Sequence, residues 1–239
     1  MWIQSFLNLP DYLFYMGSKN KIQRFKENKT FINLIQPNRE KIIKKQFEFK
    51  GNWSLNYFKN NNPIVLELGC GKGEYTLYLS ELNPKINYIG IDIKGARIWR
   101  GAKTAIEKGI KNVAFVRAQI ELISSLFSNG EIDEIWITFP DPQIKYKRSK
   151  HRLTNSNFLN MYRKILKSKG LINLKTDSSF LYGYTLGIIE GLGAKVLFSH
   201  NDIYNNPSSP IESTSVQTFY EKTFLKNNKK ISFIKFCFE

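Results

Sequence analysis

Cysteine and histidine are scarce in this sequence of 239 residues, which contains two of each. Cys70 and Cys237 cannot form a disulfide framework, so we expect the protein in a reducing compartment, the cytoplasm. The cysteines and histidines are dispersed without the spacing of metal ligands, and the sequence therefore predicts no metal site.

Long apolar runs are also lacking. The longest, such as ISFIKFCF at the C-terminus, are strand-length and include a lysine, which predicts no membrane-spanning segment. Residues 1–15, MWIQSFLNLPDYLFY, are apolar but have no basic start and no small-residue cleavage site, and Pro10 and Asp11 interrupt them. This is not the pattern of a signal peptide.

Acidic residues are few: 20 Asp and Glu stand against 36 Lys and Arg, a net charge of +16. In residues 19–50 ten basic and three acidic residues leave +7, and in residues 143–170 nine basic residues and no acid leave +9, which together make the whole excess. Such an excess attracts RNA, DNA or an anionic membrane. The run KYKRSKHR at 145–152 repels itself unless a polyanion neutralises it, although either segment could also be a solvated surface.

From residue 62 onward, apolar strand patterns alternate with helical patterns. The predicted helices lie near 74–82, 94–108, 120–128, 155–168 and 179–191, and the predicted strands are PIVLELG, INYIGID, VAFVRA, EIWITF, GLINLKTD, KVLFSH and ISFIKFCF. This alternation is typical of a parallel sheet with helices on both faces. The chain has no internal repeat and no low-complexity linker. We therefore expect one domain over residues 51–239, preceded by a basic N-terminal arm over residues 1–50.

Polar residues follow successive predicted strands. Because ligands of open α/β sheets bind beyond the carboxyl ends of the strands, we expect these residues to converge on one cleft. They are Glu67 with the turn GCGKG (69–73), Asp92, Gln119, Asp141 and Asp177.

The turn GCGKG excludes two nucleotide-binding motifs. It is not a phosphate-binding P-loop, and Glu74 stands where a dinucleotide fingerprint has its third glycine, so the sequence disfavours a pyrophosphate ligand. An adenosine ligand without phosphates fits better, with Asp92 placed to bind a ribose diol. A purely structural turn is the alternative.

Several motifs in this order resemble known families. ELGCGKG followed by IGID resembles motifs I and II of class I S-adenosylmethionine-dependent methyltransferases, and TFPDPQIKYKRSKHRLT, LKTD and TFYEKTF resemble the tRNA (guanine-N7)-methyltransferase family. The resemblance implies a doubly wound, Rossmann-like, mostly parallel sheet of seven strands with an antiparallel last strand. It also implies methyl transfer from S-adenosylmethionine to N7 of a guanine at position 46, in the variable loop of tRNA.

The resemblance also implies roles for individual residues. Catalysis would fall to Asp141; S-adenosylmethionine would be bound by Glu67, Gly69, Gly71, Asp92, Gln119 and Asp141, and the tRNA guanine by Lys145, Asp177, Thr218, Tyr220 and Glu221. In many relatives an acid stands where this chain has Gln119, whose amide can still contact the exocyclic amine of adenine. Members of the family commonly begin near the sequence found here at Met16, so we expect residues 1–15 to be an upstream extension.

Guanine N7 carries a free lone pair, so its methylation requires no general base, and catalysis is expected mainly from positioning. Pro140 and Pro142 restrict Asp141, which we expect between the two ligands to orient them, although it could also cap a turn. Asp177 and Glu221 suit the N1–H and N2–H₂ groups of guanine, but each could be an ordinary surface acid.

Two further segments are expected near the substrate. Phe219 and Tyr220 could stack on the base, although in a strand or loop such aromatics more often belong to the core. Lys145 is expected to pair with phosphate, and the track would continue through Lys147, Arg148, Lys150 and Arg152.

Other functions remain open at this point. A methyltransferase of the same fold could act on another RNA, a protein or a small molecule, and a nucleic-acid-binding module could have the fold without activity. A nicotinamide oxidoreductase is disfavoured by the missing third glycine. The sequence does not distinguish a monomer from a homodimer.

Overall fold

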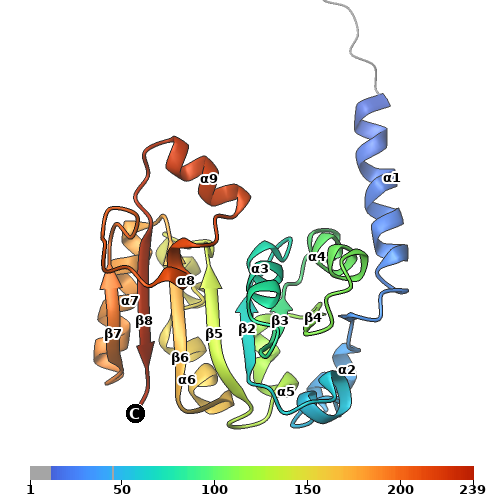
Figure 1. Cartoon of the computed structure of the whole chain (residues 1–239), viewed down its shortest axis with the longest axis horizontal. Helices are drawn as coiled ribbons and strands as arrows, with labels where there is room; N and C mark the ends of the chain where they lie inside the picture. Colours follow the sequence, from blue (N-terminus) through green and yellow to red (C-terminus); the bar gives the residue numbers. More distant parts are fainter. Residues whose placement is uncertain (1–11, 45) are drawn as a thin grey trace, which may run out of the picture.

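The centre of the fold is one β-sheet of eight strands, in a computed structural model that describes residues 12–44 and 46–239 (Figure 1). Residues 1–11, most of the expected upstream extension, lie outside the described residues. The strand order is β1-β4-β3-β2-β5-β6-β8-β7. The strands are β1 (Leu34–Ile35), β2 (Ile64–Leu68), β3 (Asn87–Ile91), β4 (Val113–Val116), β5 (Ile132–Thr138), β6 (Leu166–Thr176), β7 (Lys195–His200) and β8 (Ser232–Cys237).

The sheet has the predicted topology with one additional strand. All neighbouring pairs from β1 to β6 are parallel, and β8 runs antiparallel to both β6 and β7, which confirms the antiparallel last strand. The prediction of seven strands was one short, because the two-residue β1 pairs with β4 and is too short to show a strand pattern. β1 comes from the expected N-terminal arm, which also buries Ile42 and Phe47 in the core.

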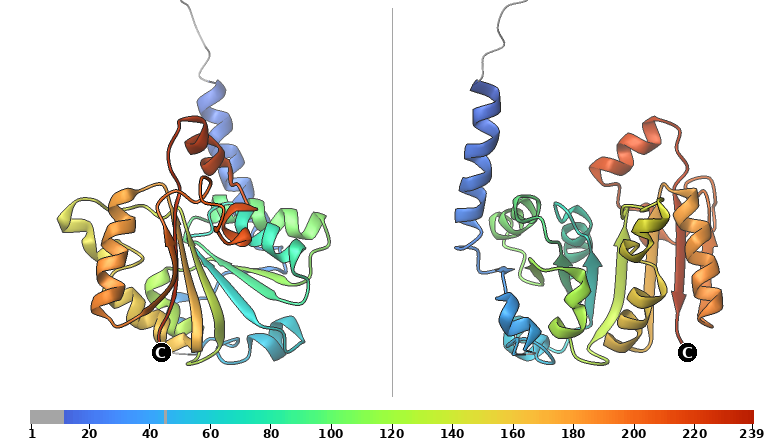
Figure 2. Two further views of the ribbon diagram at one scale, coloured as in Figure 1. Left: turned by 60° about the vertical axis from the view of Figure 1, so that its left-hand side comes forward. Right: turned by 180° about the vertical axis from the view of Figure 1, so that it is seen from behind.

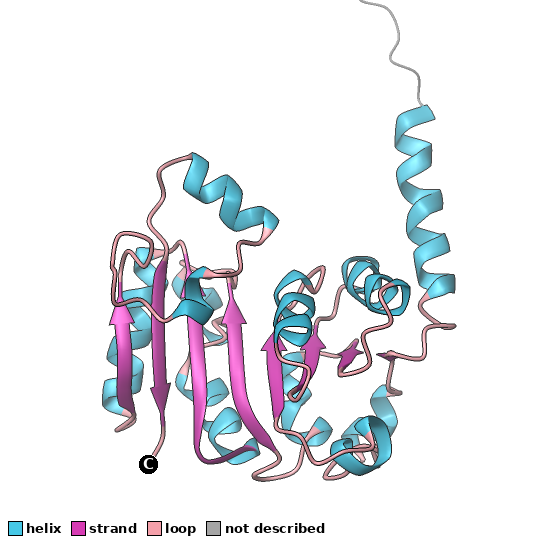
Figure 3. Cartoon of the chain, viewed as in Figure 1, coloured by secondary structure: helices cyan, strands magenta, loops and turns pink. Residues whose placement is uncertain are grey.

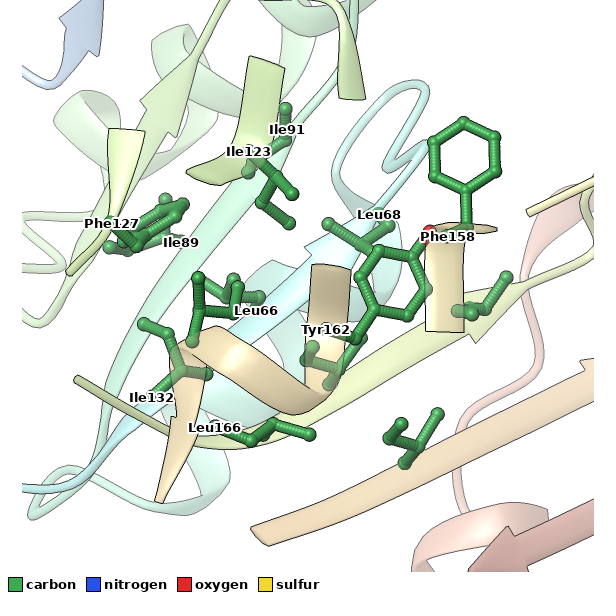
Figure 4. Close-up of a cluster of buried hydrophobic side chains, with 14 of the residues drawn as sticks. Leu66, Leu68, Ile89, Ile91, Ile123, Phe127, Ile132, Phe158, Tyr162 and Leu166 are labelled. Carbon is green, nitrogen blue, oxygen red and sulfur yellow. The ribbon is translucent and has the colours of Figure 1, made fainter. Parts of the chain in front are cut away.

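Helices cover both faces of the sheet (Figures 2 and 3). Alternate side chains of a strand point to opposite faces, so that Leu66 and Leu68 pack in one core cluster and Val65 in the other. Figure 4 shows residues of the first cluster, among them Phe158 and Tyr162 of α6 beside Leu66 and Leu68 of β2. The longer helices of the two faces are α3 (Glu74–Leu82), α4 (Gly95–Glu107), α6 (Ser156–Ile165) and α7 (Ser179–Gly191).

Shorter elements complete the described chain. They are α2 (Arg39–Ile43), a π-helix (Trp53–Phe58), α5 (Ile123–Leu126), α8 (Ile211–Thr214) and two 3₁₀ segments (Ile120–Leu122 and Tyr146–His151).

Among the residues described, no helix has both the length and the apolar character needed to cross a membrane.

Two helices rise beyond the carboxyl ends of the parallel strands, on opposite sides of the molecule (Figures 1 and 2). They are α1 (Tyr12–Glu27), which lies against α4, and α9 (Phe219–Lys226). The alternative that Phe219 and Tyr220 belong to the core, in a strand or loop, is wrong: both lie at the start of α9 and are 61% and 48% exposed. Residues 166–168, expected at the end of a helix, instead begin β6.

Candidate active site

The glycine turn after β2 is tied to the neighbouring strand. Gly69 and Gly71 have φ angles of 78° and 57°, in the left-handed region that favours glycine. The amide of Gly71 donates to Asp92 Oδ2 (2.9 Å), and Asp92 Oδ1 accepts from the amide of Lys94 (2.7 Å). Asp92, which is 9% exposed, thereby holds both the turn and the start of α4. Each of its oxygens can accept one more hydrogen bond.

Glu67 lies buried beneath this turn. Its Oε2 accepts from the backbone amide (2.9 Å) and the hydroxyl of Thr76, and its Oε1 accepts from the hydroxyl of Thr138 (2.7 Å). Burial raises the pKa of Glu67 to about 7, against the lowering effect of these hydrogen bonds, and the charge of Asp92 raises it further. Glu67 is therefore a carboxyl group poised to change its charge near neutral pH.

A cavity of about 100 Å³ lies between the glycine turn and α9. Groups at the carboxyl ends of two strands, β2 and β5, line it together with groups from α3, α4 and α9. Its lining residues include Glu67, Gly69, Gly71, Thr138, Thr218 and Tyr220.

A larger cavity of about 740 Å³ adjoins the first. Asp141 and Asp177 line it, together with Pro140, Pro142 and His151. The two cavities share four lining residues, which are Gly69, Arg97, Phe139 and Tyr220. Two ligands, one bound in each cavity, would meet at this shared boundary.

The loop that carries Asp141 has a strained backbone. Phe139 has a φ angle of 47° and precedes a proline, a combination that costs about 1–3 kcal/mol. Asp141 is exposed, and its Oδ1 accepts from the amide of Gln143 (3.0 Å), whose φ angle is 48°. Asp141 thus caps a turn and lines the larger cavity at the same time.

Helix α9 is attached over the smaller cavity by a buried ion pair. Lys175 Nζ lies 2.6 Å from Glu221 Oε1, and neither side chain is exposed. Lys175 also donates to the carbonyl of Val216 (3.0 Å), and the hydroxyl of Tyr204 donates to Glu221 Oε1 (2.8 Å). Burial lowers the pKa of Lys175 and raises that of Glu221, and the charge of each partner opposes the shift in the other.

The start of α9 is held at two further points. Thr218 caps the helix by accepting from the amide of Glu221 (3.3 Å), and Glu74 Oε2 of α3 accepts from the amide of Phe219 (2.8 Å). Tyr220 is therefore presented to both cavities from a fixed helix end.

The chain is similar to known methyltransferases over most of its length. A family model described as "Putative methyltransferase" matches residues 61–234. A tRNA (guanine-N(7)-)-methyltransferase of Christiangramia forsetii is 62% identical over 92% of this chain and 99% of its own, and one of Bacteroides fragilis is 43% identical over 91% and 85%. The chain belongs to the tRNA (guanine-N7)-methyltransferase family.

Solved structures support the fold of this family member. The 16S rRNA methyltransferase KamB superposes with a TM-score of 0.61 over 81% of this chain and 95% of its own, at 12% identity. This likeness agrees with the class I, Rossmann-like methyltransferase fold expected from the sequence.

The structure brings together some of the residues expected to form the methyltransferase site. Glu67, Gly69 and Gly71 line the smaller cavity, and Asp92 contacts its wall through Gly71. Thr218 and Tyr220 line this cavity, and Gly69, Asp141, Asp177 and Tyr220 line the larger one.

Three other expected residues lie elsewhere. Gln119 follows β4 and Lys145 precedes the 3₁₀ segment at 146–151; both are exposed and line neither cavity. Glu221 is fully buried, as the partner of Lys175. Asp177 is not a free surface acid, because its Oδ2 accepts from Lys229 Nζ at 3.0 Å.

The basic run after Asp141 divides into exposed and buried residues. Lys145, Lys147, Arg148 and Lys150 are exposed. Arg152 is not part of this track: it is 6% exposed and donates to the carbonyls of Gln143 and Ile144. Its guanidinium also lies over the rings of Phe180 and Tyr184. Arg152 instead fixes the loop that carries Asp141.

Sequence reasoning missed several residues of the site. Thr138 ends β5 and binds Glu67, so its place at a strand end could have indicated it. Arg97 and Lys229 line the larger cavity from a helix and a loop, where no strand-end pattern applies. Among the described residues, no group of three or more His, Cys, Asp or Glu side chains is placed to hold a metal ion.

Proposed function

We propose that this protein transfers the methyl group of S-adenosylmethionine to N7 of a guanine in tRNA, at position 46 of the variable loop. The observation that carries the proposal is the pair of adjoining cavities, one beneath the glycine turn and one beside Asp141 and Asp177. Membership of the family supports the reaction, and the resemblance of the FPDP segment and its basic run supports the position.

The residues around the glycine turn fit S-adenosylmethionine. The left-handed glycines allow the main chain to approach a ligand closely, and Asp92 has acceptor capacity left for a ribose diol. Glu67 offers a buried carboxylate to a positively charged ligand, although its oxygens are already hydrogen-bonded. We propose that Gln119 contacts the adenine, reaching it from the exposed position after β4.

The larger cavity fits a guanine base. Asp177 is an acceptor suited to N1–H and N2–H₂, and adenine presents the opposite pattern on that edge. Tyr220 is half exposed on the shared boundary and is placed to stack on a base. We propose Lys145 and its exposed neighbours as phosphate ligands. Glu221 would reach a base only if its ion pair with Lys175 opened.

S-adenosylmethionine supplies an electrophilic methyl group on a sulfonium. N7 of guanine attacks with its own lone pair, so the protein removes no proton before the attack, and His151 in the larger cavity is not needed as a base. The protein contributes by holding the base in line with the methyl group, which can lower a barrier by about 7–11 kcal/mol. Asp141, held by its turn between two prolines, orients the ligands at the boundary and balances the positive charge that passes to the purine.

The test is incubation with labelled S-adenosylmethionine and total tRNA, followed by nucleoside analysis. We expect the label in 7-methylguanosine, at position 46 when the modified tRNA is mapped by cleavage at the methylated base. Label in another nucleoside, or in protein and not in RNA, would overturn the proposal.

A further inference from the structure

A second cationic surface lies on the other side of the cavities from the basic run. In residues 94–103 of the sequence there are four basic residues and no acidic one. Arg97, Arg100 and Lys103 are three residues apart on α4, so they lie along one stripe of the helix. Arg97 lines both cavities, so this stripe begins at the site.

Three cations of this stripe and of α1 gather around one aromatic ring. Arg24, Arg100 and Lys103 lie 4.7, 5.0 and 5.0 Å from the centroid of the Trp99 ring, which is itself 8% exposed. We call these four residues the Trp99 surface. The ring gives each cation a favourable contact, but it does not neutralise their charge.

A single carboxylate accompanies these three cations. Glu27 Oε2 lies 3.7 Å from Lys103 Nζ and accepts from the indole N–H of Trp99 at 2.8 Å. Among the described residues, no carboxylate lies within 4.0 Å of the guanidinium of Arg24, Arg97 or Arg100. The surface therefore keeps a net positive charge that an external anion would neutralise.

The Trp99 surface lies where a single large substrate could contact both it and the larger cavity. Helix α1 rises beyond the carboxyl ends of the strands on the side of α4, and α9 rises on the opposite side (Figures 1 and 2). A substrate that places one base in the larger cavity and is much wider than the cavity would extend over one or both of these helices. Folded RNA has this width and a phosphate at every nucleotide.

We propose that the Trp99 surface binds the sugar–phosphate backbone of the tRNA and thereby positions α1 against the substrate. This inference rests on the proposed function. Arg24, Arg100 and Lys103 contact phosphates, and Arg97 links this surface to the cavities. Because phosphates carry no sequence information, the surface contributes affinity and orientation, and the choice of base stays with the larger cavity.

The test is a triple variant, Arg24→Gln, Arg100→Gln and Lys103→Gln, which removes three charges and keeps part of each side-chain stem. The matched control is Lys85→Gln, Lys111→Gln and Lys195→Gln, which removes three exposed charges at the opposite, amino edge of the sheet. Binding of tRNA is measured at several KCl concentrations, together with the yield of 7-methylguanosine at saturating tRNA and thermal unfolding of each protein.

We expect the triple variant to bind tRNA about 10-fold more weakly and to lower the slope of log Kd against log[KCl] by about 2–3, as for the loss of three phosphate contacts. Its kcat and its affinity for S-adenosylmethionine remain those of the wild type, and the control variant changes neither Kd nor slope. If the triple variant unfolds, Arg100→Gln alone is expected to lower the slope by about 0.7–0.9.

A triple variant that folds and binds tRNA as the control does, while the wild type produces 7-methylguanosine, would overturn this inference and leave the proposed function intact. If the wild type produces no 7-methylguanosine, the proposed function fails instead. The two failures are thus distinguished by one set of assays.

Discussion

Glu67 shows how one residue can serve both the fold and the site. The same carboxylate receives hydrogen bonds from α3 and β5 and lines the smaller cavity. Because its pKa is raised from 4.5 to about 7, the neutral form is favoured in the folded protein. Its contribution to stability is therefore complete below pH 4.5 and is lost as the pH rises through 7.

Between pH 4.5 and 7, we expect the contribution of Glu67 to the free energy of unfolding to fall by about 3 kcal/mol. The substitution Glu67→Gln should remove this pH dependence. Urea denaturation of the two proteins at a series of pH values measures it. The affinity of the wild type for positively charged S-adenosylmethionine should rise over pH 6–8 as the carboxyl ionises. An identical pH dependence of stability in Glu67→Gln would show that another group is responsible.

Asp141 can be tested separately as a turn cap and as a catalytic residue. Asp141→Asn keeps an oxygen that accepts from the amide of Gln143, whereas Asp141→Ala removes it. We expect both variants to lower kcat by at least about 100-fold, because the base is no longer held in line, with the fold retained. Normal turnover in Asp141→Asn would mean that only the turn matters.

Among the structural elements, α9 closes one side of the smaller cavity. It brings Thr218 and Tyr220 to the cavity and is held by Glu74 and by the buried pair of Lys175 and Glu221. Removing one partner of such a pair leaves a buried charge without compensation. The position of α9 therefore depends on a residue of β6 that contacts no ligand cavity.

We expect Lys175→Met to destabilise the protein by about 3–5 kcal/mol, and Lys175→Met combined with Glu221→Leu to recover most of that loss. Urea denaturation measures the stability, and hydrogen exchange of residues 217–226 reports whether α9 detaches first. If the single variant is as stable as the wild type, the pair does not hold the helix.

The elements that sequence patterns predicted are those with strong local signals. Helices 74–82 and 179–191 and strand 195–200 match the structure within their stated bounds, because apolar periodicity and flanking turns define them. β1 and α9 were missed for different reasons. β1 has only two residues, and α9 fully buries only Glu221, while Phe224 and Leu225 are partly buried against the core, so its sequence shows no strong apolar face. The burial of Glu221 depends on Lys175, far away in the sequence, which no local pattern shows.

The same distinction applies to the site. Residues that end strands, such as Glu67 and Asp141, could be predicted because parallel strands deliver their carboxyl ends to one edge. Arg152 was predicted to extend the phosphate-binding track because of the charge of its neighbours, but two backbone carbonyls and two aromatic rings hold it in the fold. Such contacts arise only from tertiary packing.

The whole molecule places positive charge around a site built on a sheet edge. The exposed residues of the run at 145–150 lie beside the larger cavity, and the Trp99 surface lies on the side of α4. Charge on both sides of a cleft attracts a polyanion and orients it before the base enters.

Replacing Lys147, Arg148 and Lys150 with alanine should raise the KM for tRNA and flatten its salt dependence, with the affinity for S-adenosylmethionine unchanged. Steady-state kinetics at several salt concentrations measures this effect. Unchanged KM and salt dependence would identify the run as a solvated surface.

The identity of the acceptor atom is tested most directly with a tRNA that carries 7-deazaguanine at position 46, in which a C–H group replaces N7. Single-turnover methyl transfer to this tRNA is compared with transfer to the unmodified one. We predict that it binds with the same affinity and accepts no methyl group. Transfer at the rate of the unmodified tRNA would contradict an attack by N7 of that guanine.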